Sequence, residues 1–350
     1  MAGICAGKRT IARYLVDHHG FTQLYLDCNP TNEANDAING VVALSNSGSN
    51  STRPSRQHIF SNPDHLLEFV TRHWRERWVT TDITSEPILD MYARRPFFLL
   101  VGVDAPLTVR WRRYQARQNH LRSPTITPPS PDTSSDSDDD TAQTALETFV
   151  SLSDAHLYDP TTGANPLISR ATVRLLNTSA SLAHLYATLG KLDLLNADRL
   201  RPSWDSYFMS LASLAAQRSN CMKRRVGCVV VRDKRVISTG YNGTPRGLQN
   251  CGEGGCGRCN DAGSHGSGQG LATCLCIHAE ENALLEAGRE RLSQGAVLYC
   301  DTCPCLTCSI KIVQVGIGEV VYSQGYSMDG ETAAVFRQAG VRLRQFVPVS

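Results

Sequence analysis

The stretch HAEENALLEAGRERLSQGAVLYCDTCPCLTCSIKIVQVGIGEVVYSQ (residues 278–324) decides the fold of the C-terminal part of this chain. In it, two helical patterns, HAEENALLEAG and PCLTCSIKIVQVG, alternate with two apolar strand patterns, AVLYCD and EVVYSQ. Upstream, the helical pattern SWDSYFMSLASLAAQRS (203–219) precedes two strands, VGCVVV (226–231) and RVISTGY (235–241), joined by a short polar turn. Two adjacent strands followed by alternating helices and strands predict a mixed sheet with helices on both faces.

The same stretch carries residue types that suit a catalytic zinc ion. His278-Ala279-Glu280 and Pro304-Cys305-x-x-Cys308 match the H-x-E…P-C-x-x-C pattern of zinc nucleobase deaminases. Cys305 and Cys308 are three residues apart at a predicted helix start, so both thiolates lie on one helix face. Together with His278 they make three protein ligands, and a catalytic zinc keeps its fourth position for water. We predict a zinc site held by these three residues.

Glu280 is placed to move protons without ligating the metal. It follows the histidine ligand by two residues, so it can take a proton from an activated water, pass it to ring N3 and later protonate the departing amine. The alternative is a structural zinc knuckle, but such a site is normally closed by a fourth cysteine or histidine. The glutamate and the proline favour catalysis, and we predict Glu280 as the catalytic residue.

A second group of cysteines predicts a structural zinc site. NCGEGGCGRCN (250–260) has almost no apolar residues, so a metal would organise what burial cannot. The predicted ligands are Cys251, Cys256 and Cys259, with Cys221 or Cys276 as the fourth; Cys274 and His265 are weaker candidates, and free thiols are the alternative. Cys300 and Cys303 also form a C-x-x-C pair, which we interpret as packing residues that line the catalytic site.

Composition narrows the classes of protein. Of the 13 cysteines, all but Cys5 and Cys28 lie between Cys221 and Cys308, which favours metal binding over a disulfide framework. The net charge of +2 gives no support for a nucleic-acid partner. No apolar run approaches the roughly 20 residues of a membrane span, and the N-terminus lacks the apolar core of a secretory signal. We expect a protein of the cytoplasm or the nucleus.

The first part of the chain predicts a separate α/β domain. PFFLLVGVD (96–104) has the pattern of a buried strand, and the basic helix TVRWRRYQARQ (108–118) follows it. The Pro-, Ser- and Asp-rich segment 123–143 is predicted to be a disordered insert. We place one domain at 1–195 and the second at 201–350.

Ala6-Gly7-Lys8-Arg9-Thr10 resembles the end of the Walker A loop of nucleotide kinases. The motif requires Gly where Ala2 stands and Ser or Thr where Arg9 stands, and the sequence before Ala6 leaves no room for a preceding strand. These departures favour a degenerate, regulatory or structural kinase-like domain over a working kinase. A start site placed too late, which would remove the strand, is the other explanation.

Beyond the zinc motif, RPSWDSYFM (201–209), NCMKRRVGCVVV (220–231) and GYNGTPRG (240–247) resemble the fungal deoxycytidylate deaminases, as does the kinase-like extension. This resemblance implies a cytidine-deaminase α/β/α sandwich with a five-stranded mixed sheet in residues 201–350. It also implies hydrolysis of dCMP to dUMP and ammonia, which supplies dUMP for dTMP synthesis. A homohexamer, activation by dCTP with Mg²⁺ and inhibition by dTTP are further implications of the resemblance.

The resemblance extends to several binding residues. Asn242 is similar to the family's sugar-contacting asparagine, although an Asn-Gly pair is also a common turn. Tyr241 and Gly243 belong to the same motif, where effector or subunit contacts are expected. Arg246 and the basic run 223–225 are candidates for nucleotide phosphates, and solvation of a surface is the alternative for each.

Two other classes of function compete with this interpretation. A nucleic-acid editing deaminase would need a basic groove with interleaved aromatic residues, which the C-terminal sequence lacks. A zinc module without activity would lack Glu280 or close the site with a fourth ligand, and neither is seen. Free cytidine is a nearer rival substrate, because the zinc chemistry does not involve the phosphate.

Overall fold

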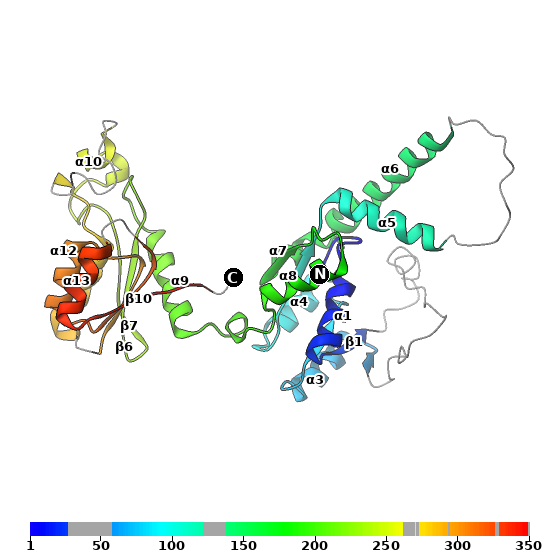
Figure 1. Ribbon diagram of the computed structural model, residues 1–350, viewed down its shortest axis with the longest axis horizontal. Coiled ribbons are helices and arrows are strands. Elements are labelled where there is room, and N and C mark those ends of the chain that lie inside the picture. The colour runs from blue at the N-terminus through cyan, green and yellow to red at the C-terminus, as the bar shows by residue number, and fades with distance from the viewer. Residues whose placement is uncertain are drawn as a thin grey trace. The chain divides into compact units, whose positions relative to one another are not determined.

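The computed structural model describes residues 1–26, 58–121, 137–261, 270, 273–292, 295–325 and 329–348. The chain divides into two compact units, Met1–Leu200 and Arg201–Ser350. Figure 1 colours the first from blue to green and the second from green to red. None of the described helices combines the length and the apolar composition that a membrane span requires.

The second unit is built on one mixed sheet. Its strands are β6 (Gly227–Arg232), β7 (Arg235–Tyr241), β8 (Val297–Thr302), β9 (Glu319–Gln324) and β10 (Arg342–Gln345), in the spatial order β10-β9-β8-β6-β7. β6 is antiparallel to both neighbours, whereas β8, β9 and β10 are parallel. The prediction of a five-stranded mixed sheet is confirmed.

Helices cover both faces of this sheet. α9 (Trp204–Ala216) packs on one face; α11 (Ala279–Ala287) packs on the other, where α12 (Leu306–Gln314) and α13 (Asp329–Ala339) lie with it. Both faces of β6 are apolar, so both must be buried by helices. Val229 and Val231 pack in one core with Phe208 of α9, whereas Cys228 and Val230 pack in the other core with Ala283 of α11. Ser203 caps α9 as the sequence predicts, because its Oγ accepts from the N–H of Ser206 at 3.3 Å.

Helix α11 lies very close to strand β7, and a glycine permits this approach. A Cβ added to Gly240 would stand 2.1 Å from the carbonyl oxygen of Ala279 and 2.5 Å from the nitrogen of Ala283. The amide of Asn282 also donates to the carbonyl oxygen of Tyr241 at 2.8 Å. The first turn of α11 is therefore fixed against the end of β7.

The first unit is an α/β structure with parallel strands. β1 (Thr22–Leu26) pairs with β2 (Ile59–Phe60) and β3 (Trp78–Thr80), and β4 (Val101–Asp104) pairs with β5 (Val173–Leu176). Its helices are α1 (Lys8–His19), α3 (Pro63–Arg72), α4 (Glu86–Ala93), α5 (Leu107–Leu121), α6 (Ser137–Tyr158), α7 (Asn165–Ser169) and α8 (Leu182–Leu192). Parallel strands joined through helices are the expected arrangement of an α/β domain.

Two expectations about the first unit need correction. Helix α6 begins at Ser137, so the part of the predicted disordered insert from 137 to 143 is helical; residues 123–136 lie outside the described residues. A strand partner does precede the Gly7 loop, because Ala2 forms a parallel bridge with Val103 and the amino group of Met1 donates to the carbonyl oxygen of Val101 at 2.8 Å. Residues 1 and 2 therefore lie beside β4 and pair with it in parallel.

Candidate active site

The three predicted zinc ligands converge on one point of the second unit. His278 is the N-cap residue of α11, Cys305 is the N-cap residue of α12, and Cys308 lies in the first turn of α12. The Nδ1 atom of His278 is 3.3 Å from each of the two sulfur atoms, and the three ligand atoms lie within 4.8 Å of one another. One imidazole nitrogen and two thiolates are a donor set that zinc accepts, so the residues present fit the metal.

Hydrogen bonding among the three ligand side chains favours the thiolate form of Cys305. Hydrogen bonding from Cys308 lowers the pKa of Cys305 to about 3, while the pKa of Cys308 is raised by the same contact. The bond to Cys305 raises the pKa of His278, and burial opposes this rise. The backbone N–H of Cys308, in the first turn of α12, also donates to the sulfur of Cys305 and lowers its pKa.

Glu280 lies buried beside the three ligands. Glu280 is 4% exposed. The charges of His278, Cys305 and Asp301 act on its carboxyl group. Burial raises the pKa of Glu280 to about 7, and the charge of His278 opposes the rise. A carboxyl group with such a pKa can both accept and release a proton near neutral pH, which is what the predicted role demands.

The loop that follows β7 holds the segment that carries His278. Gly243 and Ile277 exchange both backbone hydrogen bonds, at 3.2 and 3.0 Å, in an antiparallel bridge. A Cβ on Gly243 would stand 2.4 Å from the Oδ1 of Asn220, so a larger residue would require the Asn220 side chain to move. The role that the structure gives Gly243 is therefore to position the residue before His278.

Asn242 is buried, and its side chain is held by the protein. The Oδ1 atom accepts from the hydroxyl of Ser219 at 2.7 Å and from the N–H of Val226 at 2.8 Å, and Nδ2 donates to the carbonyl oxygen of Arg224 at 2.8 Å. An amide NH₂ group has two donors, so contact with a sugar would use the second N–H of Nδ2. Sugar binding by Asn242 stays a prediction.

The other predicted binding residues differ in exposure. Tyr241 is half-buried at the end of β7, whereas the side chain of Arg246 is 98% exposed and lies 3.7 Å from the carboxylate of Glu286. Thr244 was not singled out by the sequence, yet its Oγ1 is buried and has no hydrogen-bond partner among the described residues. A hydroxyl of this kind beside Asn242 and Gly243 is a further candidate for ligand contact.

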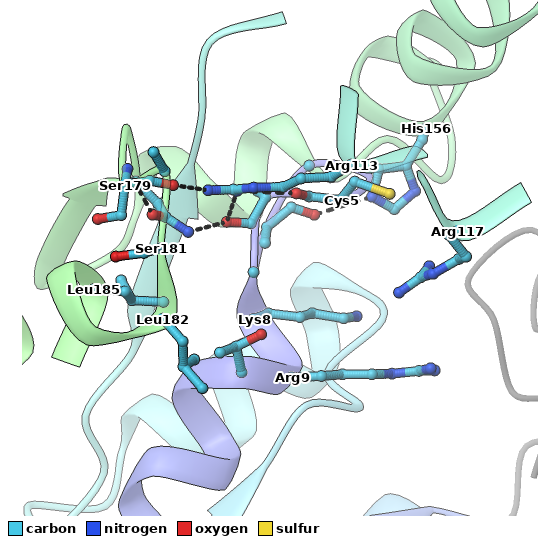
Figure 2. A pocket seen from close by; sticks show the side chains of 17 residues that line it. Cys5, Lys8, Arg9, Arg113, Arg117, His156, Ser179, Ser181, Leu182 and Leu185 are labelled. Carbon is cyan, nitrogen blue, oxygen red and sulfur yellow. Dashed lines mark hydrogen bonds between the residues drawn. The ribbon is translucent and has the colours of Figure 1, made fainter. Parts of the chain in front are cut away.

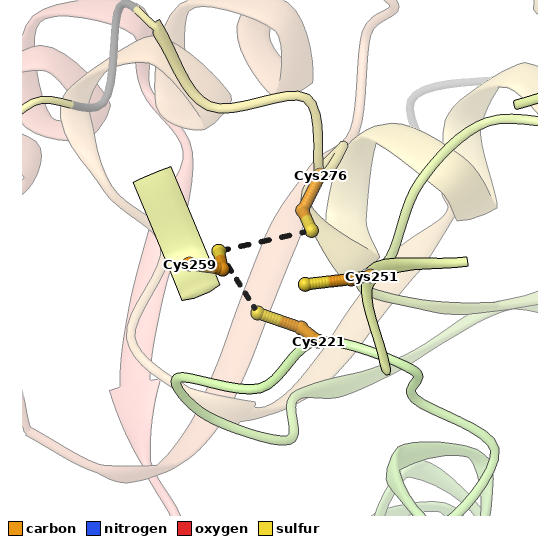
Figure 3. A group of neighbouring side chains, drawn as sticks. All are labelled: Cys221, Cys251, Cys259 and Cys276. Atoms are coloured by element: carbon orange, nitrogen blue, oxygen red, sulfur yellow. Dashed lines mark hydrogen bonds between the residues drawn. The ribbon is translucent and has the colours of Figure 1, made fainter. Parts of the chain in front are cut away.

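Six cysteines of the second unit, five of them buried and one partly buried, gather in one cluster, which we call the cysteine cluster. Four of them point toward one another in Figure 3. It consists of Cys221 after α9, Cys251, Cys256 and Cys259 around α10 (Gly257–Asn260), and Cys274 and Cys276 before His278. The structure thus brings together the five main predicted ligands of the second site and also Cys274, one of the two weaker candidates. His265 lies outside the described residues.

Backbone N–H groups support the sulfurs of the cysteine cluster. Met222 donates to the sulfur of Cys251 at 3.5 Å, and Leu275 donates to the sulfur of Cys256 at 3.4 Å. Although burial raises the pKa of Cys256, the N–H of Leu275 and its other hydrogen-bond donors outweigh burial and lower this pKa to about 6. The thiolate, which is the form that binds metals, is favoured at Cys256, whereas burial and the neighbouring cysteines raise the pKa values of Cys259 and Cys276.

Cys300 and Cys303 have a different environment. Both are buried, and Cys300 lies opposite Cys228 in the β6–β8 ladder, inside the apolar core. Neither belongs to the groups of potential metal ligands found among the described residues. Their interpretation as packing residues agrees with this placement.

The first unit has a pocket of about 270 Å³ around the Gly7 loop (Figure 2). Gly7 has a φ of 113°, and the loop is held by Arg113, which donates to the carbonyl oxygens of Cys5 and Ala6 at 3.2 and 3.3 Å. Asn177 also donates to the carbonyl oxygen of Ala6, at 2.8 Å. Other basic groups line the pocket, namely Lys8, Arg9, Arg117 and His156. The sequence indicated the loop but not these partners, which come from distant segments.

Comparison with known proteins agrees with this site. Residues 202–324 match the family model of the cytidine and deoxycytidylate deaminase zinc-binding region. The chain is 47% identical to the deoxycytidylate deaminase of Schizosaccharomyces pombe over 99% of its own length and 95% of the relative's. It is 46% identical to the deoxycytidylate deaminase of Saccharomyces cerevisiae, over 81% of this chain and 86% of the relative.

Among solved structures, the dCMP deaminase of cyanophage S-TIM5 in complex with dCMP and dUMP is 30% identical. That match covers 42% of this chain and 98% of the phage protein, with a TM-score of 0.35. The match to the Schizosaccharomyces pombe protein spans nearly the whole of both chains, and the family's zinc motif is assembled in the structure. The chain belongs to the cytidine and deoxycytidylate deaminase family, with the fungal deoxycytidylate deaminases as relatives over most of its length.

Proposed function

We propose that this protein hydrolyses dCMP to dUMP and ammonia. The observation that carries the proposal is the buried carboxyl of Glu280 beside the His278, Cys305 and Cys308 ligand set. Its relatives over most of the chain are deoxycytidylate deaminases, which supports the monophosphate as substrate. The reaction consumes one water and exchanges the amino group at C4 of the base for oxygen.

Metal binding, proton transfer and positioning are carried out by different residues of the site. A zinc ion held by His278, Cys305 and Cys308 supplies an activated water and charge stabilisation when it is bound. Glu280 accepts a proton from the water and donates it to N3 of the cytosine ring. It then accepts a second proton, from the hydroxyl group added at C4, and donates it to the departing amine. The bridge between Gly243 and Ile277 keeps His278 in position throughout.

The substrate is tested by a panel of cytosine compounds. Ammonia release is measured from dCMP, CMP, deoxycytidine and a cytosine-containing oligonucleotide under identical conditions. We expect turnover of dCMP to exceed that of the others, because a site that binds a phosphate rejects the nucleoside that lacks it. Preference for deoxycytidine or for the oligonucleotide would make the protein a nucleoside deaminase or an editing enzyme instead.

We propose zinc at the cysteine cluster as well, in a structural role. The buried core of this segment consists of cysteines, namely Cys221, Cys251, Cys256, Cys259 and Cys276, with Cys274 packed against it. Apolar burial therefore contributes little to its order, and a tetrahedral thiolate site supplies the missing stabilisation. The test is zinc content after purification, which should exceed one ion per chain.

We propose, as the resemblance implies, a homohexamer that dCTP with Mg²⁺ activates and dTTP inhibits. The residues for substrate and effector contacts are Tyr241, at the end of β7, and Asn242, Gly243 and Arg246, on the loop that follows it. The cytoplasm or the nucleus is the proposed location, where the enzyme supplies dUMP for dTMP synthesis. Sedimentation with and without dCTP, together with dCMP turnover at several dTTP concentrations, tests the assembly and its regulation.

For residues 1–195 we propose a degenerate nucleotide-kinase-like domain with a regulatory or structural role. The basic pocket at the Gly7 loop supports an affinity for phosphate groups. Arg9 stands where a P-loop needs a hydroxyl for Mg²⁺, which argues against phosphoryl transfer. Incubation with ATP and each nucleoside monophosphate should give no nucleoside diphosphate, and robust formation of any would contradict the proposal.

A further inference from the structure

The cysteine cluster contains two overlapping sets of four potential ligands. One set is Cys221, Cys251, Cys259 and Cys276; the other is Cys256, Cys259, Cys274 and Cys276. In each set, all four sulfur atoms lie within 4.8 Å of one another. Two residues, Cys259 and Cys276, belong to both sets, and each of the remaining four belongs to one set only.

The sulfur spacing fits tetrahedral zinc. Zn–S bonds of about 2.3 Å place the sulfurs of one tetrahedron about 3.8 Å apart. The sulfur of Cys259 is 3.8 Å from that of Cys221, 3.7 Å from that of Cys274 and 4.0 Å from that of Cys276. The sulfurs of Cys256 and Cys274 are 3.9 Å apart. These separations are far longer than the roughly 2.05 Å of a disulfide, so the cysteines are not disulfide-bonded, and their spacing is compatible with tetrahedral zinc.

We propose that the six cysteines bind two zinc ions that share the thiolates of Cys259 and Cys276. Cys221 and Cys251 complete the coordination of the first ion, and Cys256 and Cys274 complete that of the second. This inference rests on the proposal that the cluster binds zinc at all. The two-ion proposal goes further, because it states the number of ions and gives every cysteine of the cluster a ligand role.

Charge balance permits the second ion. One zinc with four thiolates has a net charge of −2, and two zinc ions with six thiolates have the same net charge. The second ion therefore adds no uncompensated charge to the buried cluster. The guanidinium of Arg258 lies 3.8 Å from the sulfur of Cys274, and backbone N–H groups reach Cys251 and Cys256, so the remaining negative charge is partly compensated.

A single ion would leave part of the cluster without a function. It would occupy one set and leave two thiols of the other set packed beside it. Both Cys251 and Cys256 are completely buried, although they lie in different sets. With two ions, all six cysteines are ligands, and the loop is fixed by more metal bonds than one ion could provide.

The shared thiolate of Cys276 connects the two ions to the catalytic residues. Cys276 is followed by Ile277, which is paired with Gly243, and then by His278. A bridging ligand is held by two metals, so the backbone before His278 is fixed more firmly than by one ion. The two-zinc cluster thus acts as a positioning element for the catalytic histidine.

Zinc content distinguishes the two-ion cluster from the alternatives. Metal analysis and native mass spectrometry of the full chain should give about three zinc ions per chain, one catalytic and two in the cluster. About two ions would mean that the cluster holds one, and the proposal would fail. About one ion would refute any zinc in the cluster, and iron in place of zinc would also overturn it.

Two variants make the test independent of absolute stoichiometry. Cys274→Ala removes a ligand of the second ion only, and Cys221→Ala removes a ligand of the first ion only. We expect each variant to lose about one zinc per chain relative to the wild type. In a one-ion cluster, at least one of the two variants would keep the full zinc content. Cys5→Ala, in the other unit, is the matched control and should change nothing.

X-ray absorption at the zinc edge covers the case in which a variant fails to fold. Two ions that share two sulfurs at about 2.3 Å must lie within about 4 Å of each other. The wild-type protein should therefore show a zinc–zinc distance in that range, besides zinc–sulfur scattering. Absence of such a distance in protein that contains its full zinc complement would contradict the shared thiolates.

Discussion

Glu280 shows how its surroundings adapt a common residue type to proton transfer. The spacing to His278 predicted its role, but the spacing does not show that the carboxyl is buried or that its pKa is raised to about 7. Those properties come from elements that pack around it, including the C-terminal end of β8, which carries Asp301, and the start of α12, which carries Cys305. Similarly, the sequence indicated Asn242 but not its bonds to Ser219 and Val226, which depend on the fold.

A second carboxylate, Asp205, predicts how stability depends on pH. It accepts from Arg344 at 2.6 and 3.1 Å and from the hydroxyl of Tyr299 at 2.9 Å, and the bonds from Arg344 lower its pKa. A carboxyl with a lowered folded-state pKa stabilises the protein above its unfolded pKa near 3.9, and this stabilisation is lost as the pH falls through the folded-state pKa. We expect Asp205→Asn to reduce the free energy of unfolding by about 1–2 kcal/mol at pH 7.

Denaturant unfolding of the wild type and Asp205→Asn between pH 2 and 7 measures this loss of stability. The difference in the free energy of unfolding between the two proteins should decrease toward acid pH. Asp233→Asn is the control, since Asp233 is 91% exposed and its 3.9 Å ion pair with Arg232 should contribute little. A difference between wild type and Asp205→Asn that persists at pH 2 would mean that the charge of Asp205 is not the cause.

At the scale of elements, the second unit was predictable because each strand and helix has its own periodic pattern. β6 to β9 and α9, α11 and α12 lie within a few residues of the segments that the sequence indicated. In the first unit, β2 and β3 have two and three residues, which is too short for any periodicity to show. They exist because they pair with β1, and such pairing cannot be derived from local sequence.

The ligand sets of the cysteine cluster show a similar limit. Cys251, Cys256 and Cys259 are close in sequence and were grouped from their spacing alone. Cys221 and Cys276 join them only because the end of α9 and the segment before α11 meet in the folded unit. Sequence therefore indicated a metal site, and the fold was needed to show that all six sulfurs converge.

The contact between α11 and β7 predicts the effect of one added methyl group. In Gly240→Ala, the new Cβ would overlap the backbone of Ala279 and Ala283, so α11 must move with His278 and Glu280. We expect a loss of about 1–3 kcal/mol in stability and a decrease of at least about tenfold in kcat for dCMP. Thermal unfolding and steady-state kinetics measure both quantities.

Gly330→Ala provides the comparison for this variant. Gly330 lies in α13, and a Cβ at this position meets nothing within 4 Å. Its stability and turnover should equal or slightly exceed those of the wild type, because alanine favours a helix. If Gly240→Ala behaved like Gly330→Ala, the close approach of α11 would not be what positions the catalytic residues.

At the scale of the whole molecule, each unit has its own core. The core clusters of the first unit and those of the second share no residue, and the complete zinc ligand set lies in the second. Residues 201–350 should therefore fold alone and bind zinc. We expect this fragment to deaminate dCMP, with kcat within about tenfold of the full chain.

The full chain expressed in parallel is the reference for the fragment. Circular dichroism and zinc content establish folding, and dUMP formation establishes activity. A folded, zinc-loaded fragment without turnover would show that residues 1–200 contribute to catalysis. Such a result would replace the proposed regulatory or structural role of the first unit by a catalytic one.

Formation of dUMP from dCMP by wild type, Glu280→Gln and Glu281→Gln tests the central claim most directly. Glu281 is the matched control, because it is the neighbouring carboxylate and pairs with Lys311 at 2.7 Å outside the ligand set. We predict that Glu280→Gln keeps its zinc content but loses about 10²–10⁴-fold in kcat, and that Glu281→Gln stays within about tenfold of wild type. Turnover by zinc-loaded Glu280→Gln at a rate close to wild type would contradict the account.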